Sequence, residues 1–508
     1  MQVPIDMAVE TELKLSITPE HMEMLRRLPL LRQLAVGRAV NRKLYSAYFD
    51  TPDLVLHDHA MALRLRRSGR QWLQTLKGGG GVKAGLHQRS EWEMPVKGEA
   101  LDLDAIESAG GVLPRGIRDK LQPLFVTDFS RNLRVLHFEG AEIELCLDSG
   151  EIRAGRRKRP ISELELELRS GDPGKLFKLA QMLLDHVPLQ VETISKAEYG
   201  YRLHSGKSQQ VVKASFPQLV PSQSIGSALQ SMIASCLLHV QANVPGAMRR
   251  LNEEYLHQVR VGLRRLRVML AMAETIAADE TLHRLHEEVA EMCIEFGHMR
   301  EWDVFITQTL APMCERLPQH AGLRKVKATG EKLRSRYHAE VVHRLESSDY
   351  QRLLLRFGAW MYGDYWKAVP AISGSGLVDF AAGILNKRSR QVARRGKHVA
   401  SADAGRLHQL RIACKKLRYS SEMFGPLFPE GKHKRYVAGL SSLQDILGVL
   451  NDLAVAERLL TDMQEQVPHD ALDLIRGWMA HERTAQKAAL AKAWKRFSGR
   501  KPFWLRAA

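Results

Sequence analysis

The sequence predicts an α+β barrel in residues 1–204, followed by an all-α domain built from two repeated helical bundles. Three observations support this fold class. Charged and apolar residues alternate in several short segments up to residue 168, which is the period of a half-buried β-strand. Beyond residue 223, apolar residues recur at helical spacing almost to the end of the chain. Within that helical region, two sequence landmarks recur at one fixed offset of 151 residues.

Length and composition describe a globular protein. At 508 residues, the chain is long enough for two or three domains, each with its own core. No apolar run approaches the roughly 18 residues that span a bilayer. Met1 to Asp6 lacks the features of a signal peptide, so we expect a cytoplasmic protein with no membrane partner. Without any Cys-x-x-Cys pair, the five cysteines are expected to be reduced core residues: Cys146, Cys236, Cys293, Cys314 and Cys414.

The net charge of +18 is concentrated in the second part of the chain. Residues 1–205 carry 30 Lys plus Arg against 28 Asp plus Glu, so +16 belongs to residues 206–508. A polycation of this size attracts polyanions, whether nucleic acid, polyphosphate or an anionic membrane surface. The two halves are therefore expected to differ in their ligands.

The first strand-like segment, Val9 to Leu15, carries a charge on every second residue. On a β-strand, Glu10, Glu12 and Lys14 share one face. Two carboxylates beside an ammonium group suit a metal ion together with a phosphate. The simpler interpretation of this segment alone is a half-buried strand with a solvated charged face.

The same alternation recurs along the first 170 residues. A Thr-Pro-Glu start predicts a helix from Pro19 to about Leu34, and a second, amphipathic helix is expected over 176–186. Further strands are expected at 45–49, 62–67, 71–77, 87–93, 142–148 and 163–168, with glycines 78–81 forming the flexible tip of a hairpin. An ordinary solvated face would carry Thr, Ser and Gln among its charges. If these strands close into a barrel with their charged faces inward, the lumen can bind both cations and an oxyanion.

Four motifs occur in order in this region: Glu10-x-Glu12-x-Lys14, Leu63-Arg64-Leu65-Arg66, Thr75-Leu76-Lys77 and Glu163-Leu164-Glu165-Leu166-Glu167. Together they resemble the CYTH or triphosphate tunnel metalloenzyme superfamily over about residues 1–203. The resemblance implies an antiparallel tunnel barrel that hydrolyses a triphosphate with Mg²⁺ or Mn²⁺. Class IV adenylate cyclases and thiamine triphosphatases are similar members, so the substrate does not follow from the fold.

The resemblance also implies which cations hold the triphosphate. Its non-bridging oxygens need positive partners, and the matching residues are Lys14, Arg64, Arg66 and Lys77, with Arg131 and Lys196 as additions. We expect Lys14 and Lys77 to act directly in catalysis. Tyr48 is a candidate for proton transfer, although a tyrosine in an alternating strand is more often structural.

Carboxylates hold hard divalent cations through oxygen, and the candidate metal ligands are Glu10, Glu12, Asp148, Glu165 and Glu167. One metal ion would neutralise phosphate oxygens, and a second ion, or the carboxylates around it, would orient and activate a water for in-line attack. Glu10 and Glu12 complete the expected catalytic set, and no covalent nucleophile is needed. Glu91, Glu93 and Arg89 share the charged face and are expected to orient the phosphate-binding side chains.

A polar, proline-broken linker is expected at 205–222, before a helical domain at 223–505. Tyr255 to Arg267 recurs as Arg406 to Arg418, and Phe296 to Met299 recurs as Leu447 to Leu450, both offset by 151 residues. Two separate landmarks with one offset indicate duplicated units, each a bundle of about four helices.

In both repeats a basic stripe follows one helical face, because its residues stand at i, i+3, i+7 and i+10. The stripes comprise His257, Arg260, Arg264 and Arg267, then His408, Arg411, Lys415 and Arg418. Rows of like charge repel, so a compensating anion or buried acids are expected. The alternative is a solvated basic face with carboxylate partners. A metal site at the histidine pair is not expected, since no acid lies in the stripe.

The duplicated His-x-x-Arg pattern resembles the CHAD family over roughly residues 223–500. That resemblance implies binding of inorganic polyphosphate or a similar polyanion along the basic grooves. The repeats differ at one place, where Arg300-Glu301-Trp302-Asp303 is answered by Asn451-Asp452-Leu453-Ala454. The acidic positions of the two halves are therefore not equivalent.

The leading hypothesis is an inorganic triphosphatase, a phosphoanhydride hydrolase that needs Mg²⁺ or Mn²⁺ and forms diphosphate and phosphate, with a helical domain that binds polyphosphate. No specific nucleic-acid partner is expected. One alternative is a triphosphatase or cyclase that acts on a nucleotide or thiamine triphosphate. The other is a non-catalytic polyphosphate-binding scaffold.

Overall fold

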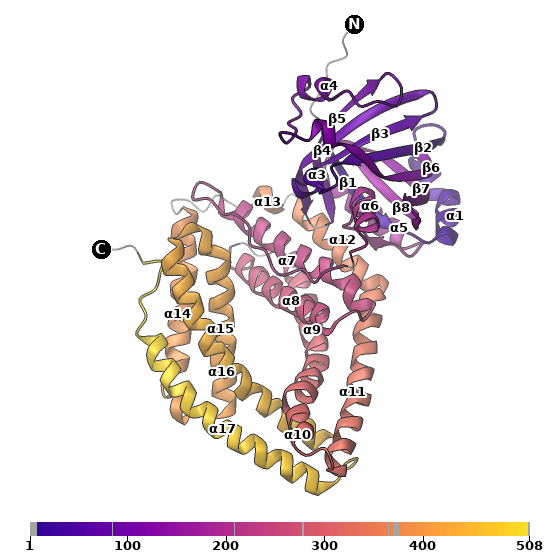
Figure 1. The fold of residues 1–508 in the computed structure, drawn as a ribbon. Coiled ribbons are helices and arrows are strands. Elements are labelled where there is room, and N and C mark those ends of the chain that lie inside the picture. The colour runs from indigo at the N-terminus through magenta and orange to yellow at the C-terminus, as the bar shows by residue number, and fades with distance from the viewer. Residues whose placement is uncertain are drawn as a thin grey trace. The chain divides into compact units, whose positions relative to one another are not determined.

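The computed structural model describes residues 8–83, 85–207, 209–276, 279–363, 365–368 and 376–505. Met1 to Asp6, on which the expectation of a cytoplasmic location partly rests, lies outside them. Two compact units divide the chain (Figure 1): the barrel unit, residues 1–211 with 346–367, and the helical unit, residues 212–345 with 368–508. None of the helices in the described ranges is long and apolar enough to cross a bilayer.

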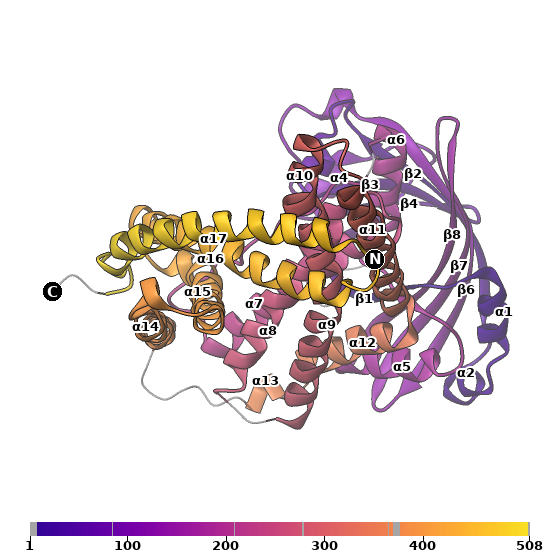
Figure 2. The same cartoon turned by 90° about the horizontal axis from the view of Figure 1, so that it is seen from below.

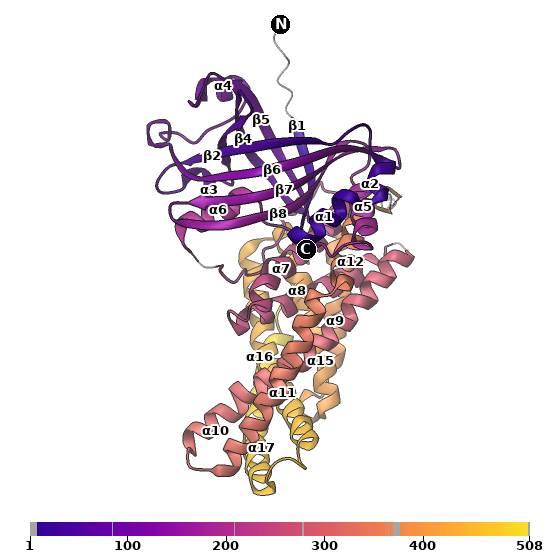
Figure 3. The same ribbon diagram turned by 90° about the vertical axis from the view of Figure 1, so that its right-hand side faces the viewer.

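The barrel unit is built on one antiparallel sheet that closes on itself, as the predicted fold class requires. The sheet order is β5-β4-β3-β2-β6-β7-β8-β1, and β1 also pairs with β5 to complete the barrel. Figure 3 shows β2, β6, β7 and β8 side by side. The strands are β1 (Ala8–Ser16), β2 (Val40–Asp50), β3 (Ala62–Ser68), β4 (Gln71–Lys83), β5 (Leu86–Val96), β6 (Gln122–Phe138), β7 (Ala141–Ala154), β8 (Arg157–Ser170) and β9 (Gln190–Val191), which pairs with the end of β1.

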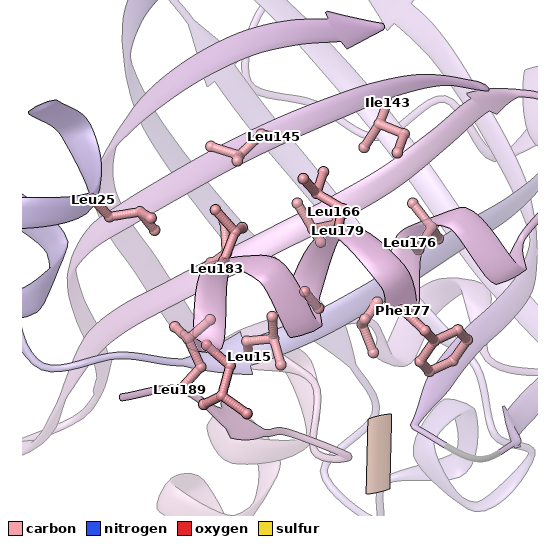
Figure 4. Packing of buried hydrophobic residues seen from close by; sticks show 14 of the residues in the cluster. Leu15, Leu25, Ile143, Leu145, Leu166, Leu176, Phe177, Leu179, Leu183 and Leu189 are labelled. Atoms are coloured by element: carbon pink, nitrogen blue, oxygen red, sulfur yellow. The ribbon is translucent and has the colours of Figure 1, made fainter. Parts of the chain in front are cut away.

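Helices cover the apolar outer face of the barrel. Figure 4 shows Leu179 and Leu183 of one helix beside Leu166 and Leu15 of the strands, within one buried hydrophobic cluster. The alternation of the strands explains this cluster, since their leucines point outward when their charges point inward. The helices are α1 (Pro19–Arg27), α2 (Pro29–Leu34), α3 (Val55–Asp58), α4 (Leu103–Ser108), α5 (Gly174–Leu184), α6 (Lys196–Ser205), α12 (Ser348–Tyr362) and α13 (Tyr365–Ala368), with a 3₁₀ turn at Arg118–Lys120.

Two local predictions in this unit are wrong. The helix expected from Pro19 to Leu34 breaks at Leu28, whose ψ of 123° is extended because a following proline disfavours the helical conformation. The glycines 78–81 do not form the hairpin tip, because they lie inside β4, at an irregularity in its pairing with β5. Gly80 has φ +70°, and a Cβ there would lie 1.9 Å from the carbonyl oxygen of Gln88. Only glycine fits this bulge.

The helical unit contains two sets of four long helices, one from each repeat, which matches the number that the duplication predicts. The first comprises α7 (Ile225–Met248), α8 (Glu253–Ala273), α9 (Glu280–Val304) and α11 (Ala321–Glu346), with a π-helix at Phe305–Leu310 and α10 (Ala311–Arg316) after α9. The second comprises α14 (Leu377–Gly396), α15 (Ala404–Phe424), α16 (Glu430–Asp462) and α17 (His469–Ser498), with 3₁₀ turns at Val399–Ser401 and Gly425–Leu427. The bounds of α8 and α15 differ by the predicted 151 residues. Figure 2 shows α16 and α17 running side by side.

One helix lies in a different unit from the one that its sequence position suggests. α12 falls inside the domain predicted for 223–505, yet residues 346–367 belong to the compact barrel unit. Its packing against α5 is described below.

Candidate functional sites

A cavity of about 370 Å³ occupies the barrel interior and collects most of the predicted site residues. All six predicted phosphate-binding cations line it, as do Glu10, Glu12, Glu165, Glu167 and Tyr48. Arg89, Glu91 and Glu93 line it too. Asp148 does not, since it is 0% exposed and lies behind Arg131 and Lys196.

Strand register brings these side chains together from distant parts of the sequence. Lys14 of β1 lies opposite Glu165 of β8, and Glu12 lies opposite Glu167. On the other side of the barrel, Arg64 of β3 pairs with Tyr48 of β2. Successive side chains of a strand point to opposite faces. Once one charged side chain points into the barrel, the other charged residues at alternate positions therefore point inward too.

Three cations surround Glu165. Lys14 and Arg131 both form ion pairs with it, and Lys196 Nζ donates to Glu165 Oε1 at 2.8 Å. Burial alone would raise the pKa of Glu165, but Lys14, Lys196 and Arg131 outweigh burial and hold it well below its usual range. Arg131 also donates from Nε to Asp148 at 2.7 Å. Glu165 and Asp148 therefore fix the position of Lys14, Arg131 and Lys196, and their own role as metal ligands stays a prediction.

A second group of paired charges lies on β3, β4 and β5. Lys77 contacts Glu10 and lies 3.4 Å from Glu91. Arg64 is 3.3 Å from Glu91 and 3.5 Å from Glu93, and it donates to the Thr75 hydroxyl at 3.2 Å. The expectation that Glu91 and Glu93 orient phosphate-binding side chains agrees with these contacts.

Arg66 differs from the other five predicted phosphate-binding cations, which all form ion pairs. In the described ranges it forms no ion pair, and its Nε donates to the Ser46 hydroxyl at 3.2 Å. Burial, followed by repulsion from Arg64 and Arg131, lowers the pKa of Arg66 to about 10. Burial would raise the pKa of the adjacent Tyr48, but Arg64 and Arg66 outweigh it and lower that pKa. This part of the cavity therefore has an excess of positive charge that an anion would relieve.

The opposite excess occurs at Glu167. Burial raises the pKa of Glu167 to about 7, with further contributions from the Glu10, Glu144 and Glu12 carboxylates. A hard divalent cation suits such a cluster, because oxygen ligands are the ones it prefers. No group of three or more acidic, His or Cys side chains in the described ranges already has the geometry to hold a metal ion. The donor chemistry of Glu10, Glu12 and Glu167 fits a divalent cation, and the side chains would have to converge around it.

A second cavity, of about 580 Å³, lies within the helical unit. It brings together basic residues from both repeats: His257, Arg260 and Arg264 of α8 with His408, Arg411 and Lys415 of α15. Arg267 and Arg418 do not line it, and Arg418 instead lies 3.4 Å from Glu422. The two predicted stripes thus form one cavity rather than two separate grooves, which argues against the interpretation as a solvated face.

Charge in this helical cavity is poorly compensated. Burial, then repulsion from Arg264 and Arg411, lowers the pKa of Lys415 to about 5. Burial and Arg264 likewise lower the pKa of Arg260 to about 9. Asp452 lies 4.0 Å from Arg411, which is a weak contact. An anion that enters this cavity would meet cations with few carboxylate competitors.

The non-equivalent segments of the two repeats both reach the helical cavity. Asn451 Oδ1 lies 2.7 Å from His408 Nδ1 and accepts a hydrogen bond from it in the tautomer that carries a proton on Nδ1. Glu301 forms an ion pair with Arg458 across the repeats. Arg300 lines the same cavity. The difference between the repeats therefore changes the lining of the helical cavity directly.

Sequence reasoning missed several cavity residues. Glu144 and Arg169 line the barrel cavity and pair with each other, and Arg42 lies on β2. Glu144 could have been found, because it belongs to the same alternating row as Asp148. Arg300 and Arg458 line the helical cavity outside the repeated motif. Only spatial proximity identifies them.

Comparisons with known proteins match the first and second parts of the chain to different families. The CYTH domain model matches residues 8–201, and the CHAD domain model matches residues 231–461. Over 201 residues the chain is 35% identical to an inorganic triphosphatase of Haemophilus influenzae; the match covers 39% of this chain and 56% of that protein. The chain thus spans little more than half the length of this curated relative.

Solved structures resemble each part of the chain. A CHAD domain from the plant Ricinus communis is 27% identical, with a TM-score of 0.50 over 57% of this chain and 97% of that one. A putative adenylyl cyclase from Hippeastrum, described as having a dominant triphosphatase activity, is 19% identical with a TM-score of 0.29, over 39% of this chain and 97% of that one. The two family models match one after the other, so the chain carries a CYTH domain and a CHAD domain, in that order.

Proposed function

We propose that the barrel unit hydrolyses inorganic triphosphate to diphosphate and phosphate with a divalent metal ion. The observation that carries this proposal is the polarity of the barrel cavity. Arg66 and its neighbours hold excess positive charge, whereas Glu167 and its neighbours hold excess negative charge. A triphosphate together with a divalent cation complements both.

The cations of the chain bind and orient the substrate. Arg66 and Arg64 donate to non-bridging oxygens, as do Lys14 and Lys77, which makes the phosphorus atoms more electrophilic. The carboxylates that now pair with Lys77 and Arg64 keep these side chains in place before substrate arrives. A water attacks the terminal phosphorus, and the bond between this phosphorus and its bridging oxygen breaks. The bridging oxygen leaves as part of the diphosphate.

Glu10, Glu12 and Glu167 are the residues that would hold the divalent cation. The bound cation supplies Lewis-acid stabilisation of phosphate charge. Glu167 must be ionised to act as a ligand, and its neighbours oppose that ionisation in the ligand-free barrel. Mg²⁺ and Mn²⁺ both accept carboxylate oxygen, so the choice between them is left to experiment.

The helical unit is proposed to bind inorganic polyphosphate. Its cavity gathers Arg260, Arg264, Arg411 and Lys415 from the two repeats. A linear chain of phosphates offers a negative charge at every unit, which suits a row of cations without base-reading side chains. RNA of similar charge is the competitor to test, because electrostatic attraction alone does not discriminate between the two.

The proposal is tested by phosphate release from inorganic triphosphate, ATP and thiamine triphosphate at one metal concentration. Faster turnover of inorganic triphosphate supports the assignment. Preference for ATP or thiamine triphosphate would support the nucleotide or thiamine alternative. Polyphosphate binding without any turnover would support a non-catalytic scaffold.

A further inference from the structure

One helix of the barrel unit is encoded within the CHAD part of the sequence. α12, residues 348–362, lies inside the stretch that the CHAD domain model matches. It packs mainly on α5 and also touches β9. The chain reaches it directly from α11, with Ser347 alone between the two helices.

The packing of α12 is that of an internal helix rather than of a surface appendage. Leu355 is 0% exposed and belongs to the same buried cluster as Leu13 and Leu15 of β1. A Cβ on Gly358 would lie 2.0 Å from the Phe177 ring of α5, so the backbone of α12 rests on that ring. Tyr362 stacks on Phe177 with ring centroids 5.8 Å apart.

A hydrogen bond connects α12 to the strand beside Lys14. The Val191 amide of β9 donates to Gln351 Oε1 at 2.9 Å. β9 pairs with β1 at Leu15 and Ser16, and the next amide, that of Glu192, donates to the carbonyl oxygen of Lys14 at 2.9 Å. Gln351 is therefore two hydrogen bonds away from the backbone that carries Lys14.

A second contact reaches the hairpin formed by β4 and β5. The Tyr362 hydroxyl donates to the carbonyl oxygen of Lys83 at 3.4 Å, near the end of β4. Lys83 lies opposite Leu86, which pairs with Leu13 of β1 where the barrel closes. α12 thus contacts the segments on both sides of β1.

We propose that α12 completes the CYTH barrel and that Gln351 is a positioning residue for Lys14. Among the described residues, Gln351 forms no hydrogen bond with a side chain that lines the barrel cavity; it holds β9, and β9 holds the end of β1. The buried packing supplies rigidity, and the hydrogen bond sets the position of β9 along β1. The effect of Gln351 on hydrolysis rests on the proposed triphosphatase function, whereas its effect on strand order does not.

Hydrogen exchange on the full-length protein tests the positioning without substrate. Gln351→Ala is expected to speed exchange of the Glu192 amide about tenfold or more, because β9 loses the contact that holds it. Gln351→Glu keeps an acceptor oxygen and is expected to restore protection. Arg352→Ala is the matched control, because Arg352 lies on the same helix as Gln351 and forms an exposed ion pair with Asp185. Unchanged exchange in Gln351→Ala would overturn the proposal.

Kinetics on the same variants test the consequence for the barrel cavity. Gln351→Ala is expected to lower kcat/KM for inorganic triphosphate about tenfold at a temperature where the protein stays folded, and Gln351→Glu to recover most of it. Polyphosphate binding by the helical unit should not change. Faster exchange with unchanged kcat/KM would overturn the positioning role. If the wild-type protein releases no phosphate, the proposed function fails, and hydrogen exchange still decides whether α12 orders β1.

Discussion

The two cavities differ in how they balance their charges. In the barrel, most cations already contact carboxylates, as Lys14 does with Glu165 and Lys77 with Glu10. In the helical unit, Arg260, Arg264 and Lys415 line one cavity with few acids nearby. Burial, followed by repulsion from Arg264, lowers the pKa values of Arg260 and Lys415. The barrel cavity holds an ordered arrangement of opposite charges, whereas the helical cavity is a concentration of one charge.

The difference bears on what each cavity can do. Fixed ion pairs place charges at defined positions before a ligand arrives, which is what a catalytic site needs. A cavity of like charge gains more from any bound polyanion but imposes less geometry on it. Catalysis in the barrel and storage or recruitment of polyanion in the helical unit agree with this contrast.

A large effect is expected to distinguish Arg66, which forms no ion pair in the described ranges, from its paired neighbour Arg64. Arg66→Gln should lower kcat/KM for triphosphate by about 10- to 100-fold, because it removes charge-assisted hydrogen bonds worth roughly 1.5–3 kcal/mol. Its melting temperature should not fall, since no carboxylate in the described ranges loses an ion-pair partner. Arg64→Gln, by contrast, should lower the melting temperature, because Glu93 loses its ion-pair partner and Glu91 keeps only Lys77. Equal destabilisation by both changes would contradict the contrast.

A smaller loss is expected in the helical cavity, where binding is spread over many cations. Changing Arg264 and Arg411 together to Ala should weaken polyphosphate binding about tenfold and reduce its salt dependence. Arg267→Ala is the matched control, because Arg267 follows the same stripe but does not line the cavity. Binding titrations at two salt concentrations measure both effects. A comparable loss in the control would mean that the cavity is not the binding site.

The acidic side of the barrel predicts an effect on metal requirement. Glu167→Gln should raise the metal concentration needed for half-maximal activity several-fold, since one candidate ligand is lost. Stability without metal should stay level or rise, because the variant removes a half-buried carboxylate whose charge burial and the Glu10 carboxylate disfavour more than Arg169 favours it. Glu142→Gln on β7, whose side chain is 44% exposed, serves as the control. An unchanged metal requirement would exclude Glu167 as a ligand.

The smallest expected effect is the uptake of a fraction of a proton when polyphosphate binds to the helical cavity. With a pKa of about 5, Lys415 is mostly neutral in the empty cavity at about pH 8, and a bound polyanion favours its charged form. Binding should therefore take up a fraction of a proton, and affinity should rise as pH falls from about 8 towards 5. Calorimetry in buffers of different ionisation enthalpy measures this uptake. Lys415→Arg should reduce it. His257→Gln should not, because even the ordinary histidine pKa of 6.5 lies below a pH of about 8, so a bound polyanion leaves His257 mostly neutral there.

Much of the architecture was predictable from periodic patterns. Alternation along the strand predicted that Glu10, Glu12 and Lys14 share one face, and the 151-residue offset predicted the positions of α8 and α15. Such patterns reflect the geometry of single strands and helices, so they can be read without tertiary information. Strand β6 was not predicted, because its inward-facing row mixes Arg131 with uncharged residues and so lacks the charged alternation.

The rest depended on contacts between distant segments. Asp148 follows the charged alternation, yet it lies behind Arg131 instead of facing the cavity. Arg300 and Arg458 join the helical cavity from outside the repeated motif. The place of α12 follows from the fit of Gly358 on Phe177, and nothing in the local sequence of α12 indicates that fit. Which side chains are buried, and which distant residues they contact, depends on the tertiary structure.

Phosphate release from inorganic triphosphate by the wild-type protein and Glu10→Gln, each with and without a divalent cation, tests the central claim most directly. The account predicts rapid release by the wild-type protein only with metal, and a loss of about 100-fold or more in the variant. Helical-unit binding of polyphosphate should be equal in both proteins. Metal-independent release, or equal rates in the two proteins, would contradict the assignment of the barrel cavity as a metal-dependent triphosphatase site.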